Sequence, residues 1–400
     1  MIFDFNFYSS ILLIFVSNGL LYSFLILKKG IQFENQSNKW LSLFVFLCCM
    51  YIMPWMFGFS GWYDTQPYRD FMFYMPFQHL FFIGPILYFY VQSLLNPNFK
   101  LNKSNFWHLV PGMLYLVYSL MVFITDKVIL KKYYFYADGA DKDFDSWYQY
   151  AGFFSMVIYL VLSLRYYQKF LLLMQNILSY ADKFVFKWIK TFLIAFLSMQ
   201  LLQIIFFVVG LFYDIETYVG SWWYFFCFSI IMFYIAITGY NNNLHTQIPF
   251  EFDSFQNKKV TLLPSSNHEM SEELDFEKVS ESNFENEEIL IWKNKIMSLF
   301  ENDRAAQNPE LSLTDIAKKL KTNVSIVSKV INQGFDLNFN DFVNQYRVEE
   351  IKKAFENGDH KKNTLLGIAY DAGFNSKATF NRAFKKNTGF SPKEFLKSVG

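Results

Sequence analysis

The chain has 400 residues, of which 53% are hydrophobic and 21% aromatic, and a formal net charge of +1. This length leaves room for two or three domains. The three cysteines include no CxxC pair, so a disulfide framework is not expected. The small net charge averages two unlike parts, because residues 1–240 are apolar in long uncharged runs and residues 241–400 are polar and charged.

Seven segments of the first part are long and apolar enough to cross a bilayer as helices. A helix of about 20 residues spans the hydrocarbon core, which is roughly 30 Å thick. Trp and Tyr residues gather near the segment ends, as they do at membrane interfaces. The first segment is too long for a removed signal peptide and lacks its small-residue cleavage site. The predicted spans are Phe7–Leu27, Trp40–Phe59, Phe71–Leu95, Phe106–Ile124, Trp147–Leu164, Trp188–Phe212 and Trp222–Tyr240.

The Lys and Arg residues between these spans predict the orientation of the chain. If the C-terminal part lies in the cytoplasm, most of them fall in the inner loops, as in known membrane proteins. The loop 126–146 opposes this orientation, because it places Lys127, Lys131, Lys132 and Lys142 on the outer side. An odd number of spans with a cytoplasmic tail remains the better fit, and six or eight spans are the alternatives if one span is misjudged.

Residues 241–287 predict a flexible acidic linker. They are rich in Asn, Ser and Glu and show no sustained apolar periodicity. As a coil, a linker of about 40 residues has an end-to-end distance of about 35 Å. The residues after it carry an excess of Lys and Arg, which points to a polyanionic partner.

Residues 288–400 predict a soluble domain of seven helices. Helical spacing begins near Glu288, and Ser312 with Asp315 has the spacing of a capping box. Further helices are expected at Val324–Asn332, from Phe339 to about Phe355, at Thr364–Tyr370, at Ser376–Lys386 and after Pro392. The predicted fold class is therefore all-α: a seven-span bundle at residues 1–240, followed by a soluble helical domain.

The soluble domain contains one helical unit twice, 53 residues apart. Lys329 of the first copy recurs as Arg382 of the second, within a shared apolar frame. The frame consists of Val327, Ile331, Leu337 and Phe342, which recur as Phe380, Phe384, Phe390 and Phe395. This pattern predicts two helix-turn-helix units, in each of which one helix braces a second that enters the DNA major groove.

The second helix of each unit is its recognition helix, called its reading helix below. Exposed positions of the two reading helices have the chemistry that recognises base edges. Arg or Lys binds guanine, Asn binds adenine, and Thr or Ala can contact the thymine methyl group. A single Lys-bearing helix could equally be a solvated surface, but two matching units weaken that alternative. The expected DNA-binding residues are Ser325, Ser328, Lys329 and Asn332 in the first unit and Lys377, Ala378, Thr379, Asn381, Arg382 and Lys385 in the second.

The stretch GIAYDAGFNSKATFNRAFKKNTGFSPKEFLK contains Ala-x-x-x-Gly-Phe, Phe380-x-Arg382-x-Phe384-Lys385, Gly389 and Ser391-Pro392. In these motifs the tail, from about residue 289 to 400, resembles the AraC/XylS family of bacterial transcription regulators. The resemblance implies two helix-turn-helix units joined by a long helix. It also implies a base-facing set: Ser325, Ser328, Lys329, Lys377, Ala378 and Arg382.

One feature departs from this resemblance, and another extends it. Lys329 stands where the family usually has Arg, and Ile331 where it usually has Phe, so the first reading helix departs from the family pattern. The multispan region before the tail is similar to that of membrane-bound AraC-type regulators, which lack a soluble sugar-binding domain.

Polar residues within the predicted spans are candidates for sensing a signal. Gln78 and His79 lie between Pro76 and Pro85, so this span is expected to kink and open a polar pocket. His79 could sense pH or bind a ligand, although an interhelical hydrogen bond is the more ordinary role. The Asp cluster in the outer loop 126–146 could meet an external signal or be simply hydrated.

Motifs of enzymatic chemistry are missing from the sequence. There is no metal-ligand run, P-loop, dinucleotide glycine pattern or nucleophile motif, so no catalytic residue, metal or cofactor is expected. We expect a one-component sensor in the bacterial inner membrane with its DNA-binding domain in the cytoplasm. Its expected partners are the lipid bilayer, double-stranded promoter DNA, RNA polymerase, a second copy of the chain and an unidentified signal.

Two alternatives remain open from the sequence. The bundle could be a transporter or channel that the tail regulates by protein contact. The tail could also be a latent factor that proteolysis within residues 241–288 releases.

Overall fold

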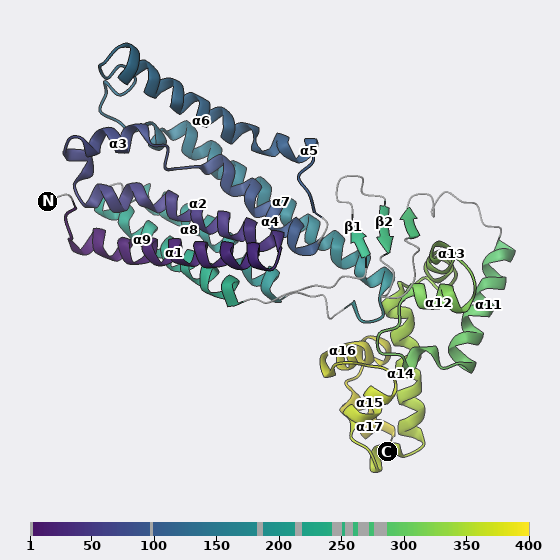
Figure 1. The fold of residues 1–400 in the computed structure, drawn as a ribbon. Coiled ribbons are helices and arrows are strands. Elements are labelled where there is room, and N and C mark those ends of the chain that lie inside the picture. Colours follow the sequence, from purple (N-terminus) through teal and green to yellow (C-terminus); the bar gives the residue numbers. More distant parts are fainter. Residues whose placement is uncertain are drawn as a thin grey trace. The chain divides into compact units, whose positions relative to one another are not determined.

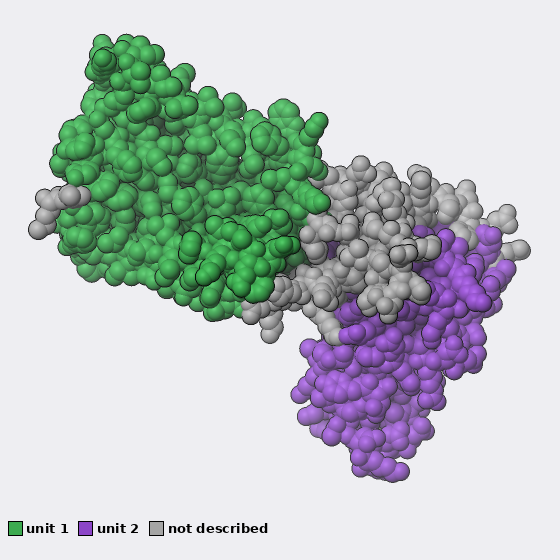
Figure 2. All heavy atoms as spheres, viewed as in Figure 1, with its two compact units in different colours: residues 1–167, 187–248 green, residues 168–186, 249–400 purple. Residues whose placement is uncertain are grey.

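The computed structural model describes residues 3–96, 99–181, 187–212, 218–241, 250–252, 259–262, 272–275 and 286–399. The chain divides into two compact units, shown in separate colours in Figure 2. Unit 1 comprises residues 1–167 and 187–248, and unit 2 comprises residues 168–186 and 249–400. Residues 168–186 thus group with the C-terminal residues, a division that the sequence did not predict.

Unit 1 is a bundle of long helices, several of which run side by side (Figure 1). Its central helix is α2, which contacts α1, α4 and α9. The apolar window of α2 is 67% buried, against 17% to 44% for the other candidate spans. The helices are α1 (Phe7–Gln32), α2 (Gln36–Phe59), α3 (Tyr68–Tyr74), α4 (Leu80–Leu95), α5 (Lys103–Phe106), α6 (Val110–Phe123), α7 (Ser146–Ile177), α8 (Lys187–Gly210) and α9 (Tyr218–Asn241). Only the part of α7 up to Tyr167 belongs to unit 1.

Small and polar residues bring α1 and α2 close together. Ser23 Oγ donates to the Ser42 carbonyl oxygen at 2.9 Å, and Ser42 Oγ donates to the Ser23 carbonyl at 2.7 Å. A Cβ atom at Gly19 would come within 2.5 Å of Cys49 Sγ, so only glycine permits this approach. Such small-residue interfaces with reciprocal hydrogen bonds are typical of helices packed in membranes.

Among the described residues, six helices are long and apolar enough to cross a membrane, not the seven that the sequence predicted. The six are Phe7–Gln32, Gln36–Phe59, Lys103–Ile129, Ser146–Ile177, Trp188–Gly210 and Val219–Asn241. The exception is the predicted span Phe71–Leu95, which is divided into α3 and α4.

The division of this span has a local and a tertiary cause. Pro76 disfavours a helical conformation at Met75 and has no N–H to donate. The next two backbone N–H groups, of Phe77 and Gln78, donate to Asp143 Oδ2 at 2.9 and 3.0 Å. The 16 residues of α4 rise about 24 Å, less than the thickness of the hydrocarbon core.

Unit 2 contains all seven helices predicted for the C-terminal domain. They are α11 (Asn286–Asn302), α12 (Leu313–Lys319), α13 (Val324–Lys329), α14 (Phe339–Glu356), α15 (Leu365–Asp371), α16 (Lys377–Thr388) and α17 (Pro392–Val399). Three short strands precede them within the predicted linker: β1 (Phe250–Phe252), β2 (Lys259–Leu262) and β3 (Glu272–Asp275). The strands form an antiparallel sheet in the order β1-β2-β3, which the sequence analysis did not predict.

Candidate functional site

The first helix-turn-helix unit is formed by α12 and α13, which pack against each other. The predicted capping box starts α12: Asp315 N donates to Ser312 Oγ at 3.3 Å, and Ser312 N donates to Asp315 Oδ2 at 2.9 Å. Asn323 caps α13 by accepting from Ile326 N at 2.8 Å. Both helix starts are therefore determined by side chains beside them in the sequence.

The second unit is formed by α15 and α16 and uses the same kind of caps. Thr364 caps α15, and Ser376 caps α16 by accepting from Thr379 N at 3.1 Å. In the turn between them Gly373 has φ +98°, and a Cβ atom there would lie 2.4 Å from the Ala306 carbonyl oxygen. Only glycine fits this turn.

The repeat relates the buried sides of the two reading helices. Val327 and Ile331 in the first unit are 0% and 1% exposed, and their counterparts Phe380 and Phe384 are 2% and 0% exposed. Equivalent apolar positions therefore orient α13 and α16 against their own units.

The opposite side of α16 presents most of the side chains predicted to bind DNA. Lys377, Ala378, Asn381, Arg382 and Lys385 are all exposed. Thr379 was predicted to be exposed, but its exposed fraction is only 6%. Its hydroxyl oxygen lies 2.9 Å from Ser376 Oγ. The Thr379 hydroxyl therefore lies beside the residue that caps α16.

The first reading helix differs from this expectation. Asn332 is exposed and Ser325 is half-buried, but Ser328 and Lys329 are only 3% and 5% exposed. The helix α13 has six residues, and β3 lies against it. Ser328 and Lys329 are therefore buried, contrary to the prediction that they occupy exposed positions.

The two units are joined by α14, in which Arg347 is 1% exposed. Its guanidinium donates to the carbonyl oxygens of Ala306 and Asn308 at 2.8 and 2.7 Å, and lies 5.6 Å from the Phe374 ring centroid. Burial lowers the pKa of Arg347 to about 10, so the side chain stays charged at neutral pH. Sequence reasoning missed this residue, because an Arg in an amphipathic helix normally predicts a solvent contact.

Two capped helix-turn-helix units, one with an exposed cationic reading helix, form the arrangement expected of a DNA-binding domain. Residues 316–398 match the family model described as "Helix-turn-helix domain". The chain is also similar to the Msm operon regulatory protein of Streptococcus mutans serotype c, with 30% identity over 89 residues. This match covers 22% of the chain and 31% of the relative, so the chain spans less than a third of the relative's length. No solved structure matches the chain.

Gln78 and His79, the two residues predicted to sense a signal, have different surroundings in unit 1. Gln78 is 1% exposed, and its side-chain oxygen accepts a hydrogen bond from Gln149 Nε2. Together with Gln149 and Gln203, Gln78 lines a cavity of about 430 Å³ whose other walls are mainly aromatic. His79 is half-buried at the start of α4, with its ring 6.1 Å from that of Phe82, and is not among the described lining residues.

Two aspartates of the loop 126–146 are buried, and one of them, Asp143, lies beside Gln78. Asp143 accepts from Tyr115 Oη at 2.6 Å as well as from the backbone N–H groups before α4, and Asp141 accepts from Tyr63 Oη at 2.6 Å. Burial and the neighbouring Asp143 raise the pKa of Asp141 to about 7, and burial also raises the pKa of Asp143. The loop is therefore more than a hydrated connection. Its Asp143 stabilises the non-helical segment between α3 and α4.

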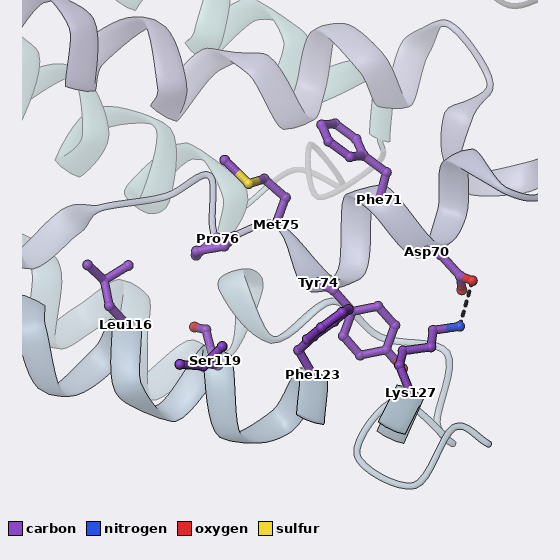
Figure 3. Close-up of a pocket in the computed structure, with 10 residues that line it drawn as sticks. Asp70, Phe71, Tyr74, Met75, Pro76, Leu116, Ser119, Phe123 and Lys127 are labelled. Atoms are coloured by element: carbon purple, nitrogen blue, oxygen red, sulfur yellow. Dashed lines mark hydrogen bonds and ion pairs between the residues drawn. The ribbon is translucent and has the colours of Figure 1, made fainter. Parts of the chain in front are cut away.

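A larger cavity, of about 700 Å³, lies between α3 and α6 (Figure 3). Its lining is mostly apolar, and one end holds an ion pair between Lys127 Nζ and Asp70 Oδ2 at 2.5 Å. Leu120 and Phe123 of its wall are 57% and 41% exposed. This cavity is thus an open surface groove, whereas the cavity at Gln78 has the more polar lining expected of a specific site.

Proposed function

We propose that the chain is a membrane-anchored, sequence-specific transcription regulator in which one polypeptide both senses a signal and binds promoter DNA. The observation that carries this proposal is the exposed face of α16, with Lys377, Asn381 and Arg382 on a helix held by a buried Phe pair. The helix-turn-helix match supports the DNA-binding part, and the apolar helices of unit 1 support the anchor.

The surface of unit 1 supports a lipid environment. Large apolar side chains are exposed along several candidate spans, including Leu21 and Phe24 on α1, Leu114 and Val117 on α6, and Ile205 and Phe207 on α8. Water-soluble proteins rarely leave contiguous apolar surfaces of this kind uncovered. The loop charges favour a cytoplasmic tail, and we place the chain in the bacterial inner membrane.

On DNA, α16 would lie in the major groove. Arg382 and Lys377 have the chemistry to bind guanine O6 and N7, Asn381 to bind adenine, and Ala378 to contact a thymine methyl group. Lys385, one turn further along, suits a phosphate. In the first unit Ser325 and Asn332 are accessible, and Ser328 and Lys329 would join them once α13 is uncovered.

The signal would act by changing the relative stability of two states of the bundle. The cavity at Gln78 is the proposed place for a small polar ligand, since three glutamine side chains converge there. His79 follows Gln78 in the sequence. We propose that it changes the relative stability of the two states at the same non-helical segment between α3 and α4. A second copy of the chain and RNA polymerase are further proposed partners.

The direct test uses the full chain in lipid nanodiscs and promoter DNA from the parent genome. Fluorescence anisotropy at 50 and 200 mM salt should show affinity falling at least about tenfold, because cationic side chains displace counterions from phosphates. A Lys377→Ala/Arg382→Ala double variant should bind more weakly and with a smaller salt dependence. Binding that ignores salt, or that the double variant retains in full, would contradict the proposal.

A further inference from the structure

The segment that follows α7 is buried within unit 2. Leu178, Ser179 and Ala181 are 1%, 0% and 3% exposed. All three belong to the same compact unit as the helix-turn-helix helices, although more than a hundred residues of chain separate them. A segment so far away in sequence and so completely buried is part of the packing of that unit.

Backbone hydrogen bonding attaches this segment to the start of the first helix-turn-helix unit. Ser179 N donates to the Leu311 carbonyl oxygen at 3.1 Å. Leu178 and Ser312 form an isolated antiparallel bridge. Ser312 is also the residue that caps α12, so the contact reaches the N-cap of the bracing helix.

Side chains of α14 complete the attachment. Asn340 Nδ2 donates to the Ser179 carbonyl oxygen at 2.7 Å, and Arg347 Nη2 donates to Ser179 Oγ at 3.2 Å. Asn344 Nδ2 donates to Asn340 Oδ1 at 3.0 Å. These three residues, at spacings of four and three, form one polar stripe on α14, and they are 5%, 3% and 1% exposed.

A buried polar stripe requires oxygen partners, because unpaired buried donors are costly. The segment 178–181 supplies a carbonyl oxygen and a hydroxyl oxygen at the positions of two of these donors. This complementarity, rather than apolar burial alone, identifies the segment as the specific occupant of the stripe.

We propose that residues 178–181 are a built-in docking segment, and that the polar stripe of Asn340, Asn344 and Arg347 on α14 is its receptor. The DNA-binding domain is then joined to the rest of the chain at two places, by the segment after α7 and by residues 241–287. Since α7 is one helix from Ser146 to Ile177, a displacement of α7 would act directly on α14, the helix that joins both DNA-reading units. This inference rests on the proposed function and names its route of regulation.

A disulfide cross-link in the full chain tests the docking. Residues opposite each other in a narrow antiparallel pair have Cα atoms about 4.5 Å apart, within the range that a disulfide spans. We would combine Leu178→Cys with Ser312→Cys and insert a site-specific protease sequence between Pro264 and Ser265. After mild oxidation of native membranes and proteolysis, the tail should remain attached on a non-reducing gel and be released by reductant.

Two controls make the result specific. The pair Leu178→Cys/Lys385→Cys, with the second cysteine on the exposed face of α16, should release its tail after proteolysis. Adding Asn340→Ala to the first pair should reduce cross-linking several-fold. Asn375→Ala should not, although Asn375 also bonds a backbone oxygen in this unit, that of Pro309 at 3.1 Å. Equal release from both cysteine pairs would overturn the docking.

The outcome is separable from that of the proposed function. A chain that cross-links but fails to bind DNA in the salt titration would refute the proposed function alone. A chain that binds DNA with the expected salt dependence but does not cross-link would refute only the docking segment.

Discussion

Arg382 and Lys329 occupy equivalent positions of the two repeats but have different surroundings. Arg382 is exposed on α16, whereas Lys329 is 5% exposed on α13. A cation that reads guanine must be able to reach the groove with its nitrogen atoms. The exposed Arg382 meets this requirement in the structure, and the buried Lys329 does not.

Replacing Arg382 by Ala should relax the base preference at one operator position, with a loss of about 1–3 kcal/mol for the preferred base. Lys361→Ala is the matched control, because Lys361 is exposed in the connection before α15 and should at most weaken binding uniformly. Lys329→Ala should change binding less than Arg382→Ala does in the full chain. Affinities across a library of operator variants give the comparison, and identical profiles for Arg382→Ala and Lys361→Ala would contradict the assignment.

The buried carboxyl group of Asp141 should make unit 1 less stable as the pH rises. Its pKa in the folded chain is raised to about 7, above the unfolded value of about 3.9, so the folded state binds the extra proton between these values. Asp141 alone should therefore lower the free energy of unfolding from about pH 4 to pH 7, by at most roughly 1.4 kcal/mol per pH unit, and Asp143, whose pKa burial also raises, should act in the same direction.

Asp141→Asn should make this dependence shallower and raise the stability at pH 8. Thermal unfolding of the detergent-solubilised chain, followed by Trp fluorescence from pH 5 to pH 8, measures the effect. Asp138→Asn is the control from the same loop, because a hydrogen bond from Lys142 holds the pKa of Asp138 below its usual value. If the stability of Asp141→Asn and of the wild type changed equally with pH, Asp141 would not be the titrating group.

At this scale the sequence predicted which side chains have suitable chemistry for binding DNA, but not which of them are exposed. The repeat was enough to locate Arg382, Lys377 and Asn381. The burial of Arg347 depends on carbonyl oxygens about 40 residues away. No local pattern contains this information.

Among the elements, helices with a cap in their own sequence were the most predictable. The starts of α12, α14 and α16 are fixed by Ser312, Asn338 and Ser376, each of which bonds a backbone N–H three residues ahead. The predicted span Phe71–Leu95 failed because its break is stabilised by Asp143, about 65 residues away. Hydropathy could not distinguish one long helix from α3 and α4.

The core positions of the repeat should differ sharply in their contribution to stability. Phe384 is 0% exposed between α14, α15 and α16, so Phe384→Ala should cost about 3–5 kcal/mol of unfolding free energy. Phe390, another member of the repeated frame, is 55% exposed, and Phe390→Ala should cost less than about 1 kcal/mol. Chemical denaturation followed by helical circular dichroism measures both, and similar losses would contradict the packing described for α16.

The acidic strand β3, with the sequence EELD, should weaken DNA binding by the first unit. Replacing residues 250–275 with a Gly/Ser segment of equal length should raise the affinity of the full chain at least about threefold, or about 0.65 kcal/mol. Replacing residues 276–285, which are also acidic, is the control for charge alone and should have a smaller effect. Unchanged affinity after the first replacement would mean that β3 does not restrict α13.

For the whole molecule, composition predicted an apolar part followed by a charged one. It did not predict that residues 168–186 would group with the charged part, because the contacts of Leu178 and Ser179 with residues 311, 312 and 340 leave no mark on hydropathy. The same contact changes the expected mechanics of the chain. A domain joined at two places can be acted on by α7, whereas a domain on a coil of about 35 Å would be merely confined near the membrane.

The central claim is that one chain anchors itself in lipid and binds promoter DNA, and flotation of proteoliposomes measures both properties together. The full chain would be reconstituted in liposomes, mixed with labelled promoter DNA and an excess of unrelated DNA, and centrifuged upward through a density gradient. We predict that the protein and the promoter DNA float together at 50 mM salt, that the DNA is left behind at high salt, and that the Lys377→Ala/Arg382→Ala variant floats without DNA. Protein that stays at the bottom, or floats while promoter DNA remains below at every salt concentration, would contradict the account.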